Sequence, residues 1–218
     1  MTEALVRLFP LPQIVLFPGT LIPLHVFEPR YRDLVAEALE TDRLLALALL
    51  RPGYEKDYEG SPAIHPVVVV GRIVDHFRLP DGRYNIAVVG LSRVRVVEEV
   101  PGRTFRRARV EAVPEEGPPV EPARLARFLD LLHLLLCRGP GAVRQVDFFP
   151  AERANAARLA DRAAAALRIG DETKQAILEE PNVAKRVARL TDELEGLIQR
   201  HLVPEVGPFH GPFRFDGN

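Results

Sequence analysis

The chain contains two serines, the residues that a hydrolase would most readily use as a nucleophile, and neither lies in a known catalytic motif. Ser61 stands between a glycine and a proline, which is typical of a turn. Ser92 lies in the segment Gly90–Val94, which lacks the final glycine of a G-x-S-x-G elbow and leads into another strand pattern. The phosphate-binding patterns G-x-x-x-x-G-K-[ST] and G-x-G-x-x-G are also absent from the 218 residues. These observations predict a protein that is not an enzyme and needs no cofactor.

Histidine and cysteine offer one pair with metal-ligand spacing. His133 and Cys137 are four residues apart and would share a helix face, as some zinc ligands do. Leucines surround the pair, and no other cysteine exists to complete a tetrahedral set. We therefore expect a buried core histidine and a buried thiol, and no metal site.

Positive charge is concentrated between residues 93 and 109, where six arginines accompany two glutamates. Such a patch could follow a phosphate backbone, with Arg103, Arg106 and Arg107 as the nucleic-acid-binding candidates. The chain as a whole has a net charge of -1, and arginines in strands often pair with nearby glutamates. RNA binding is therefore the alternative hypothesis, and a nucleic-acid partner is not the leading expectation.

These groups must be positioned by two kinds of secondary structure. Residues up to about 115 form short β-branched or alternating runs separated by proline and glycine, at 44–50, 67–79, 84–89, 94–97 and 105–113. One helix is expected from Pro29, with Tyr31, Leu34, Val35 and Ala38 among the residues on its apolar face. Fourteen of the 20 prolines lie at or before residue 122 and punctuate these strands. The pattern predicts an α+β fold that begins with a small, partly closed β-barrel.

A helical bundle is predicted after the linker at Glu115–Pro119. Residues 121–138 are apolar around most of the helix, which predicts the central helix of the bundle. An alanine-rich helix should end at a Gly170 C-cap, Asp171 should cap a short helix that runs to Glu180, and Asn182 should cap the last helix. That last helix has a heptad-like seam, favoured as an intramolecular contact over a homodimer contact. The predicted units are 1–116, 117–203 and a Pro/Gly/Phe-rich tail at 204–218.

Prolines interrupt the apolar run at residues 8–27, so it fits neither a secretion signal nor a membrane span. A single cysteine cannot form an intramolecular disulfide. We expect a cytoplasmic protein without a membrane partner, as a monomer or a homodimer.

Several motifs, taken in order, resemble one known family. In the first 31 residues these are Phe9–Pro12, Val15–Gly19, Pro23–Phe27 and Glu28–Tyr31. Later pieces agree: Asp81–Arg83 in a hairpin, Gly90-x-x-Arg93-Val94, Leu159–Asp161, and Lys174-Gln175-x-x-Leu178-Glu179. The ordered set, from about residue 5 to 202, resembles the stand-alone bacterial form of the Lon-protease amino-terminal domain.

That resemblance implies a PUA-like β-barrel followed by a helical bundle, in agreement with the sequence periodicity. In the full protease this domain helps to recognise unfolded or tagged polypeptides, while the ATPase and the Ser-Lys peptidase lie in later domains. Because this sequence contains neither a nucleotide loop nor a plausible nucleophile, the resemblance implies a Lon-type substrate-binding protein linked to proteolysis or protein quality control, and no protease activity.

The leading hypothesis is a groove between barrel and bundle that binds polypeptide segments or a protein partner. Its candidate lining residues are Phe27, Tyr31, Arg93 and Arg95, with Arg93 expected to pair with Glu28. An extended segment could add to a strand edge or lie in an apolar groove. Phe209, Phe213 and Phe215 in the tail are an alternative occupant of that groove.

Overall fold

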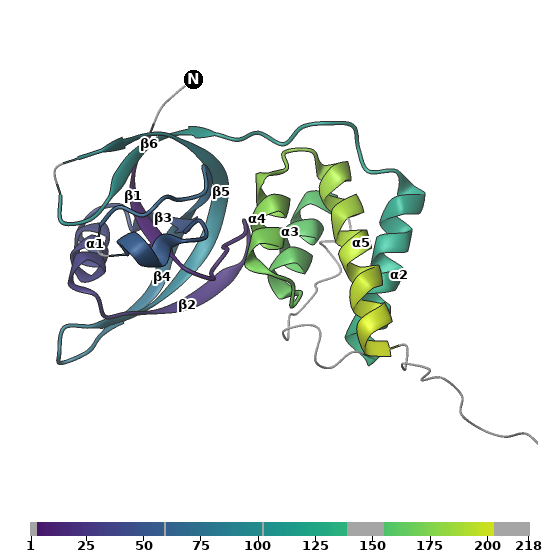
Figure 1. Ribbon diagram of the computed structural model, residues 1–218, viewed down its shortest axis with the longest axis horizontal. Helices are drawn as coiled ribbons and strands as arrows, with labels where there is room; N and C mark the ends of the chain where they lie inside the picture. Colours follow the sequence, from purple (N-terminus) through teal and green to yellow (C-terminus); the bar gives the residue numbers. More distant parts are fainter. Residues whose placement is uncertain (1–3, 59, 102, 139–154, 203–218) are drawn as a thin grey trace, which may run out of the picture.

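The computed structural model describes residues 4–58, 60–101, 103–138 and 155–202. A β-barrel and a group of four helices lie side by side, and a linker after the last strand crosses from one to the other (Figure 1). The predicted α+β class, with a barrel followed by helices, is confirmed. The predicted tail lies outside the described residues.

Six strands make one sheet in the order β2-β5-β4-β3-β1-β6, and an additional pairing between β5 and β6 closes it. β5 is long enough to pair with three strands: β4 along one edge, and along the other edge β2 with its first half and β6 with its second half. β1 and β3 are parallel, and the other pairs are antiparallel. The strands are β1 (Ala4–Leu11), β2 (Leu21–Val26), β3 (Leu44–Leu49), β4 (Val67–Arg78), β5 (Tyr84–Val100) and β6 (Arg107–Ala112).

The predicted helix is α1 (Pro29–Glu40), with proline in its first turn and Tyr31, Leu34, Val35 and Ala38 buried, as expected. A one-turn 3-10 helix, η1 (Tyr54–Asp57), follows β3. The two strands predicted at 84–89 and 94–97 form one continuous strand, since Gly90 pairs with Gly71 of β4 instead of starting a turn.

The residues described after the linker form four helices, which are α2 (Pro122–Arg138), α3 (Ala156–Ala166), α4 (Asp171–Glu179) and α5 (Val183–Leu202). α5 buries Val187, Leu190, Leu194 and Leu197, so its predicted seam is used within this chain. Lys185 N–H donates to the Asn182 side chain, which confirms the predicted cap.

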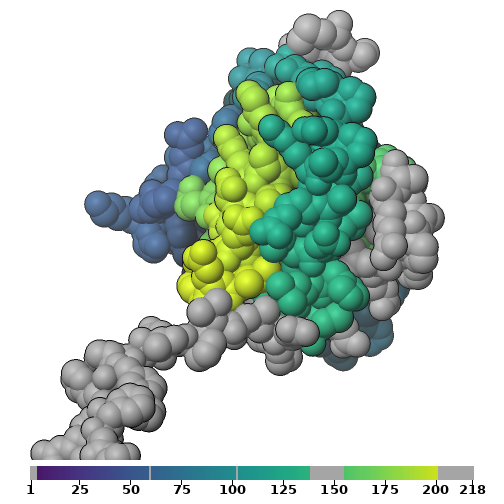
Figure 2. All heavy atoms as spheres, turned by 90° about the vertical axis from the view of Figure 1, so that its right-hand side faces the viewer, coloured from purple at the N-terminus to yellow at the C-terminus, as the bar shows by residue number. Residues whose placement is uncertain are grey.

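Three predictions about the helices were wrong. α2 is not central: it packs beside α5 at the side of the bundle away from the barrel, and α5 lies between α2 and α3 (Figures 1 and 2). Its apolar residues include the exposed Leu136, so the sequence overstated its burial. Gly170 does not cap α3, whose C-cap is Leu167. Gly170 is instead the N-cap of α4, so Asp171 is the first residue of that helix and not its cap.

The hydrophobic core runs without a break from the barrel into the bundle. One cluster of buried side chains contains Phe17 and Tyr31 of the barrel unit together with Phe128, Leu159 and Leu190 of the helices. A smaller cluster between β1, β3, β4, β5 and β6 includes Leu8 and Val110. Among the helices described, none has the length and apolar character to cross a membrane.

Candidate functional site

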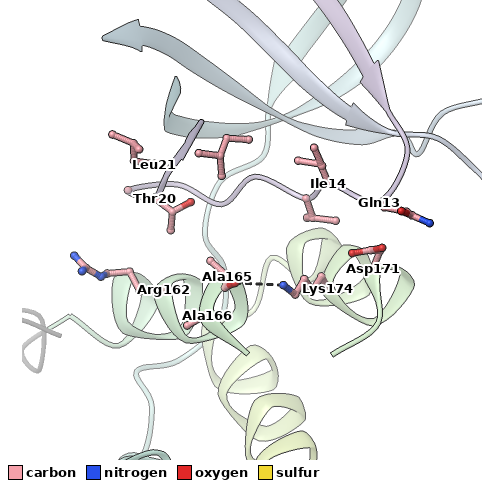
Figure 3. A pocket seen from close by; sticks show the side chains of 12 residues that line it. Gln13, Ile14, Thr20, Leu21, Arg162, Ala165, Ala166, Asp171 and Lys174 are labelled. Carbon is pink, nitrogen blue, oxygen red and sulfur yellow. Dashed lines mark hydrogen bonds between the residues drawn. The ribbon is translucent and has the colours of Figure 1, made fainter. Parts of the chain in front are cut away.

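A groove of about 600 Å³ lies between the barrel and the helices. One wall is the segment between β1 and β2 with the first residues of β2, and the other wall is formed by α3 and the start of α4 (Figure 3). Its lining residues are Gln13, Ile14, Val15, Gly19, Thr20, Leu21 and Ile22 from the barrel, and Arg162, Ala165, Ala166, Asp171 and Lys174 from the helices.

Two buried side chains and a glycine shape the barrel wall of the groove. The chain leaves β1 at Leu11, and the buried side chains of Leu16 and Phe17 fix its path across the end of the barrel. Gly19 then adopts a positive φ of 73°, which glycine tolerates without steric cost. The Thr20 hydroxyl donates to the Phe17 carbonyl oxygen at 2.8 Å, closing a tight turn before β2 begins. The wall is thus a defined irregular segment with apolar side chains on it.

Small side chains shape the helix wall. Ala165 and Ala166 of α3 face the groove and leave room that larger residues would fill (Figure 3). The Lys174 ammonium group of α4 donates to the Ala165 carbonyl oxygen at 3.2 Å, so α3 and α4 are joined at the groove itself.

Apolar surface continues from the groove along β2. Leu21, which lines the groove, is 57% exposed, and the alternation of the strand places Pro23 and His25 on the same exposed face. A second hollow of about 440 Å³ lies on this face and is lined in part by Pro23, His25 and Phe77. Phe27 follows at the end of β2, where its exposed ring stacks on His25 with 6.2 Å between ring centroids.

Buried ion pairs join the barrel to the helices behind the groove. Arg93 of β5 donates to both carboxylate oxygens of Asp161 on α3, and its Nε donates to the Leu178 carbonyl oxygen at 3.0 Å. The fully buried Arg186 of α5 pairs with Glu115 of the linker at 2.8 Å, and its Nε lies 3.9 Å from Asp161. Burial raises the pKa of the Asp161 carboxyl above its ordinary value, while Arg93 opposes this shift.

The predicted pairing of Arg93 with Glu28 was wrong. Glu28 instead accepts hydrogen bonds from Arg30 at 3.0 Å and from the Tyr58 hydroxyl at 2.6 Å. Glu28 starts α1 on the barrel, while Arg93 points towards the helices, and sequence spacing carries no information about that difference.

The four predicted peptide-binding residues do not form one surface. Tyr31 is 5% exposed, and its hydroxyl donates to the Pro10 carbonyl oxygen at 3.1 Å. Burial raises the pKa of Tyr31 to about 12. Arg93 is buried, whereas Arg95 is exposed, with its Nε 3.9 Å from a Glu111 oxygen. Phe27 is exposed beside the apolar face of β2.

The arginines proposed for nucleic acid mostly have acidic partners. Arg103 lies 3.5 Å from Glu37, and Arg106 forms a two-pronged pair with Glu99. Arg107 Nε is buried and has no hydrogen-bond partner among the described residues. Because two of the three guanidinium groups already face carboxylates, the stretch presents less positive charge than the sequence suggests.

His133 and Cys137 do lie close together, with Cys137 Sγ 3.6 Å from His133 Nε2. Both are exposed, so the expectation of a buried histidine and thiol was wrong, because they lie on the outer face of α2. Among the described residues no three His, Cys, Asp or Glu side chains are grouped as a metal site would require.

Sequence reasoning predicted a groove at this place but missed the residues that line it. Ile14, Thr20, Leu21, Ala165 and Lys174 line the groove, and none was a candidate. Two signals in the sequence could have indicated these residues. The prolines that break the apolar run before β2 mark the irregular segment of the barrel wall. The alanine-rich helix indicates close packing, but its small side chains also leave open space where no helix packs against them.

Comparison with known proteins agrees with this architecture. The model of one family, described as the ATP-dependent protease La (LON) substrate-binding domain, matches residues 6–196. Lon protease of Paraburkholderia phytofirmans is 30% identical over 208 residues, which cover 92% of this chain and 25% of that protein. Lon protease 2 of Myxococcus xanthus is 29% identical over 190 residues, covering 83% of this chain and 22% of that protein. The chain thus spans about a quarter of these relatives.

Two solved structures share the fold. The crystal structure of a Lon N-terminal domain protein from Xanthomonas campestris superposes with a TM-score of 0.65 at 25% identity, covering 87% of this chain and 98% of that one. The N-terminal domain of Mycobacterium avium complex Lon protease gives a TM-score of 0.67 at 19% identity, covering 88% and 98%, which shows the fold alone. The family match over most of the chain establishes that this protein belongs to the Lon substrate-binding domain family.

Proposed function

We propose that this protein is a non-enzymatic module that binds extended polypeptide segments in the groove between barrel and helices. The observation that carries the proposal is the groove of about 600 Å³, with apolar side chains and alanines on its walls, which continues into the exposed face of β2. Its size lies within the range of ligand sites, about 300–1,000 Å³. The occupant is a polypeptide, because the family is named for substrate binding in a protease.

The chemistry of the groove favours loose sequence requirements. Ile14, Val15 and Leu21 offer apolar contacts, and burying one leucine-sized side chain of a ligand contributes about 1.5–3 kcal/mol. Groups that bind apolar side chains without a dedicated polar pocket accept many sequences, which suits the capture of unfolded segments. The proposal extends to a cytoplasmic role in proteolysis or quality control beside an ATP-dependent protease, as a monomer or a homodimer.

The proposal is tested by titrating the protein into fluorescein-labelled, reduced and carboxymethylated α-lactalbumin, a permanently unfolded chain, and following fluorescence anisotropy. Leu21→Asp should weaken binding about tenfold, because it places a charge in the groove. Leu5→Asp is the matched control, since Leu5 on β1 is 52% exposed and does not line the groove. Its affinity should stay within about twofold of the unmodified protein.

The same titration with a labelled single-stranded RNA addresses the alternative. Absence of polypeptide binding, together with RNA binding that weakens steeply with salt and on replacement of Arg103, Arg106 and Arg107, would overturn the proposal in favour of an RNA-binding module.

A further inference from the structure

One short stretch of β5 holds both walls of the groove. Gly90 contacts the barrel wall: Gly19 N–H donates to the Gly90 carbonyl oxygen, and Gly90 N–H donates to the Thr20 carbonyl oxygen, both at 2.9 Å. Three residues later, Arg93 holds Asp161 on α3 and the last turn of α4 through the Leu178 carbonyl oxygen. The groove therefore has its two walls attached to a common strand.

Gly90 is required by the close approach of the barrel wall. A Cβ atom at this position would collide with the carbonyl group of Phe17, which is backbone and cannot rotate away as a side chain can. Any larger residue at position 90 must push the segment around Phe17 away from β5. That segment leads directly into Gly19 and Thr20, which line the groove.

Arg93 controls the opposite wall. Asp161 immediately precedes Arg162 and lies one turn before Ala165, so the bidentate contact fixes the rotation of α3 that presents both residues to the groove. The bond to Leu178 fixes α4 one turn after Lys174. Arg93 is itself buried, so it acts through these helices and not on a ligand.

We propose that Gly90 and Arg93 are positioning residues that together set the width of the groove. This inference rests on the proposed function for its importance in binding, but the groove geometry can be measured without any ligand. It also explains what the Gly90-x-x-Arg93 pattern does in this chain: Gly90 positions the barrel wall and Arg93 positions the helix wall.

The geometry is measured with spin labels on Leu21→Cys and Arg158→Cys in a Cys137→Ser background, using double electron–electron resonance. Both label sites are exposed, one on the barrel wall and one on α3. Gly90→Ala should shift the distance distribution between the labels. Gly196→Ala is the matched control, because a Cβ there meets only the end of the Arg200 side chain on α5, and neither residue lines the groove.

Arg93 is tested by the double variant Arg93→Met with Asp161→Leu. Replacing a buried ion pair by apolar residues of similar size is often neutral for stability, and Arg186 keeps its pair with Glu115, so this variant should remain folded. It should broaden the distance distribution and weaken binding of the carboxymethylated α-lactalbumin about tenfold, with a circular-dichroism spectrum that matches that of the unmodified protein.

Unchanged label distances in both Gly90→Ala and the double variant would overturn the inference. Failure of the unmodified protein to bind the unfolded chain would instead refute the proposed function, while the label distances would still decide whether these residues set the width.

Discussion

Asp161 is a buried charged residue at the junction between barrel and helices. Its carboxylate is buried between two buried guanidinium groups, those of Arg93 and Arg186. Taking charges out of water is costly, and only their mutual attraction and hydrogen bonds offset that cost. Loss of one partner leaves the others buried without compensation.

Asp161→Ala should therefore lower the free energy of unfolding by about 3–5 kcal/mol, as measured by urea denaturation. Glu115→Ala is the control, because Glu115 is half exposed and its replacement removes a partner of Arg186 alone. It should cost about 1–2 kcal/mol. An Asp161→Ala variant as stable as the unmodified protein would show that the ion pair is dispensable.

Tyr31 makes the free energy of unfolding depend on pH in the alkaline range. Its pKa in the folded protein is about 12, against an ordinary 10.0, because burial disfavours the charged phenolate. The folded state thus favours the neutral phenol, and this contribution is fully present below pH 10 and is lost as pH rises from 10 towards 12. Between pH 10 and pH 12, the midpoint of urea denaturation should therefore fall less for Tyr31→Phe than for the unmodified protein. Equal slopes for the two proteins would contradict the burial argument.

At the scale of elements, β2 has one edge paired with β5 and no strand on its other edge within the described part of the chain. In an antiparallel pair, the backbone groups of successive residues point alternately towards the partner strand and away from it. The bond from Gly90 N–H to the Thr20 carbonyl oxygen shows that Thr20 points towards β5, so the backbone groups of Leu21, Pro23 and His25 point away from it. Pro23 has no N–H group and leaves a gap in the middle of this edge. Prolines at such positions limit uncontrolled strand pairing.

Pro23→Ala should restore the missing donor and increase self-association through β2. Sedimentation velocity at increasing protein concentration should then show more dimer than for the unmodified protein. Pro80→Ala, in the exposed hairpin turn after β4, removes a proline elsewhere and should leave the distribution unchanged. A Pro23→Ala protein with the same distribution would argue against this role of the edge.

Local patterns predicted the elements better than their contacts. Pro29 and the spacing of Tyr31, Leu34 and Val35 were sufficient for α1, and Asn182 for the start of α5, because capping and periodicity are local. The continuity of β5 through Gly90 depends on pairing with β4, and burial of Arg93 depends on a partner 68 residues away. Such long-range pairs are not encoded in spacing, so a groove between barrel and helices could be predicted from the sequence but its lining residues could not.

At the scale of the whole molecule, several ties make barrel and helices one platform. Gln175 of α4 donates to the Val67 carbonyl oxygen at 2.9 Å, and His65 lies 3.2 Å from Glu179 on the same helix. With the continuous core and the Arg93 contacts, these bonds fasten the helices that line the groove to the barrel. A preformed site costs less ordering on binding than one assembled by the ligand.

The most direct test is to map where an unfolded polypeptide contacts the isotope-labelled protein by amide chemical-shift changes in NMR. We expect shifts concentrated in residues 13–22 and 162–174, with little change around Arg103–Arg107. Shifts confined to the Arg103–Arg107 face, or no shifts at saturating polypeptide, would contradict it.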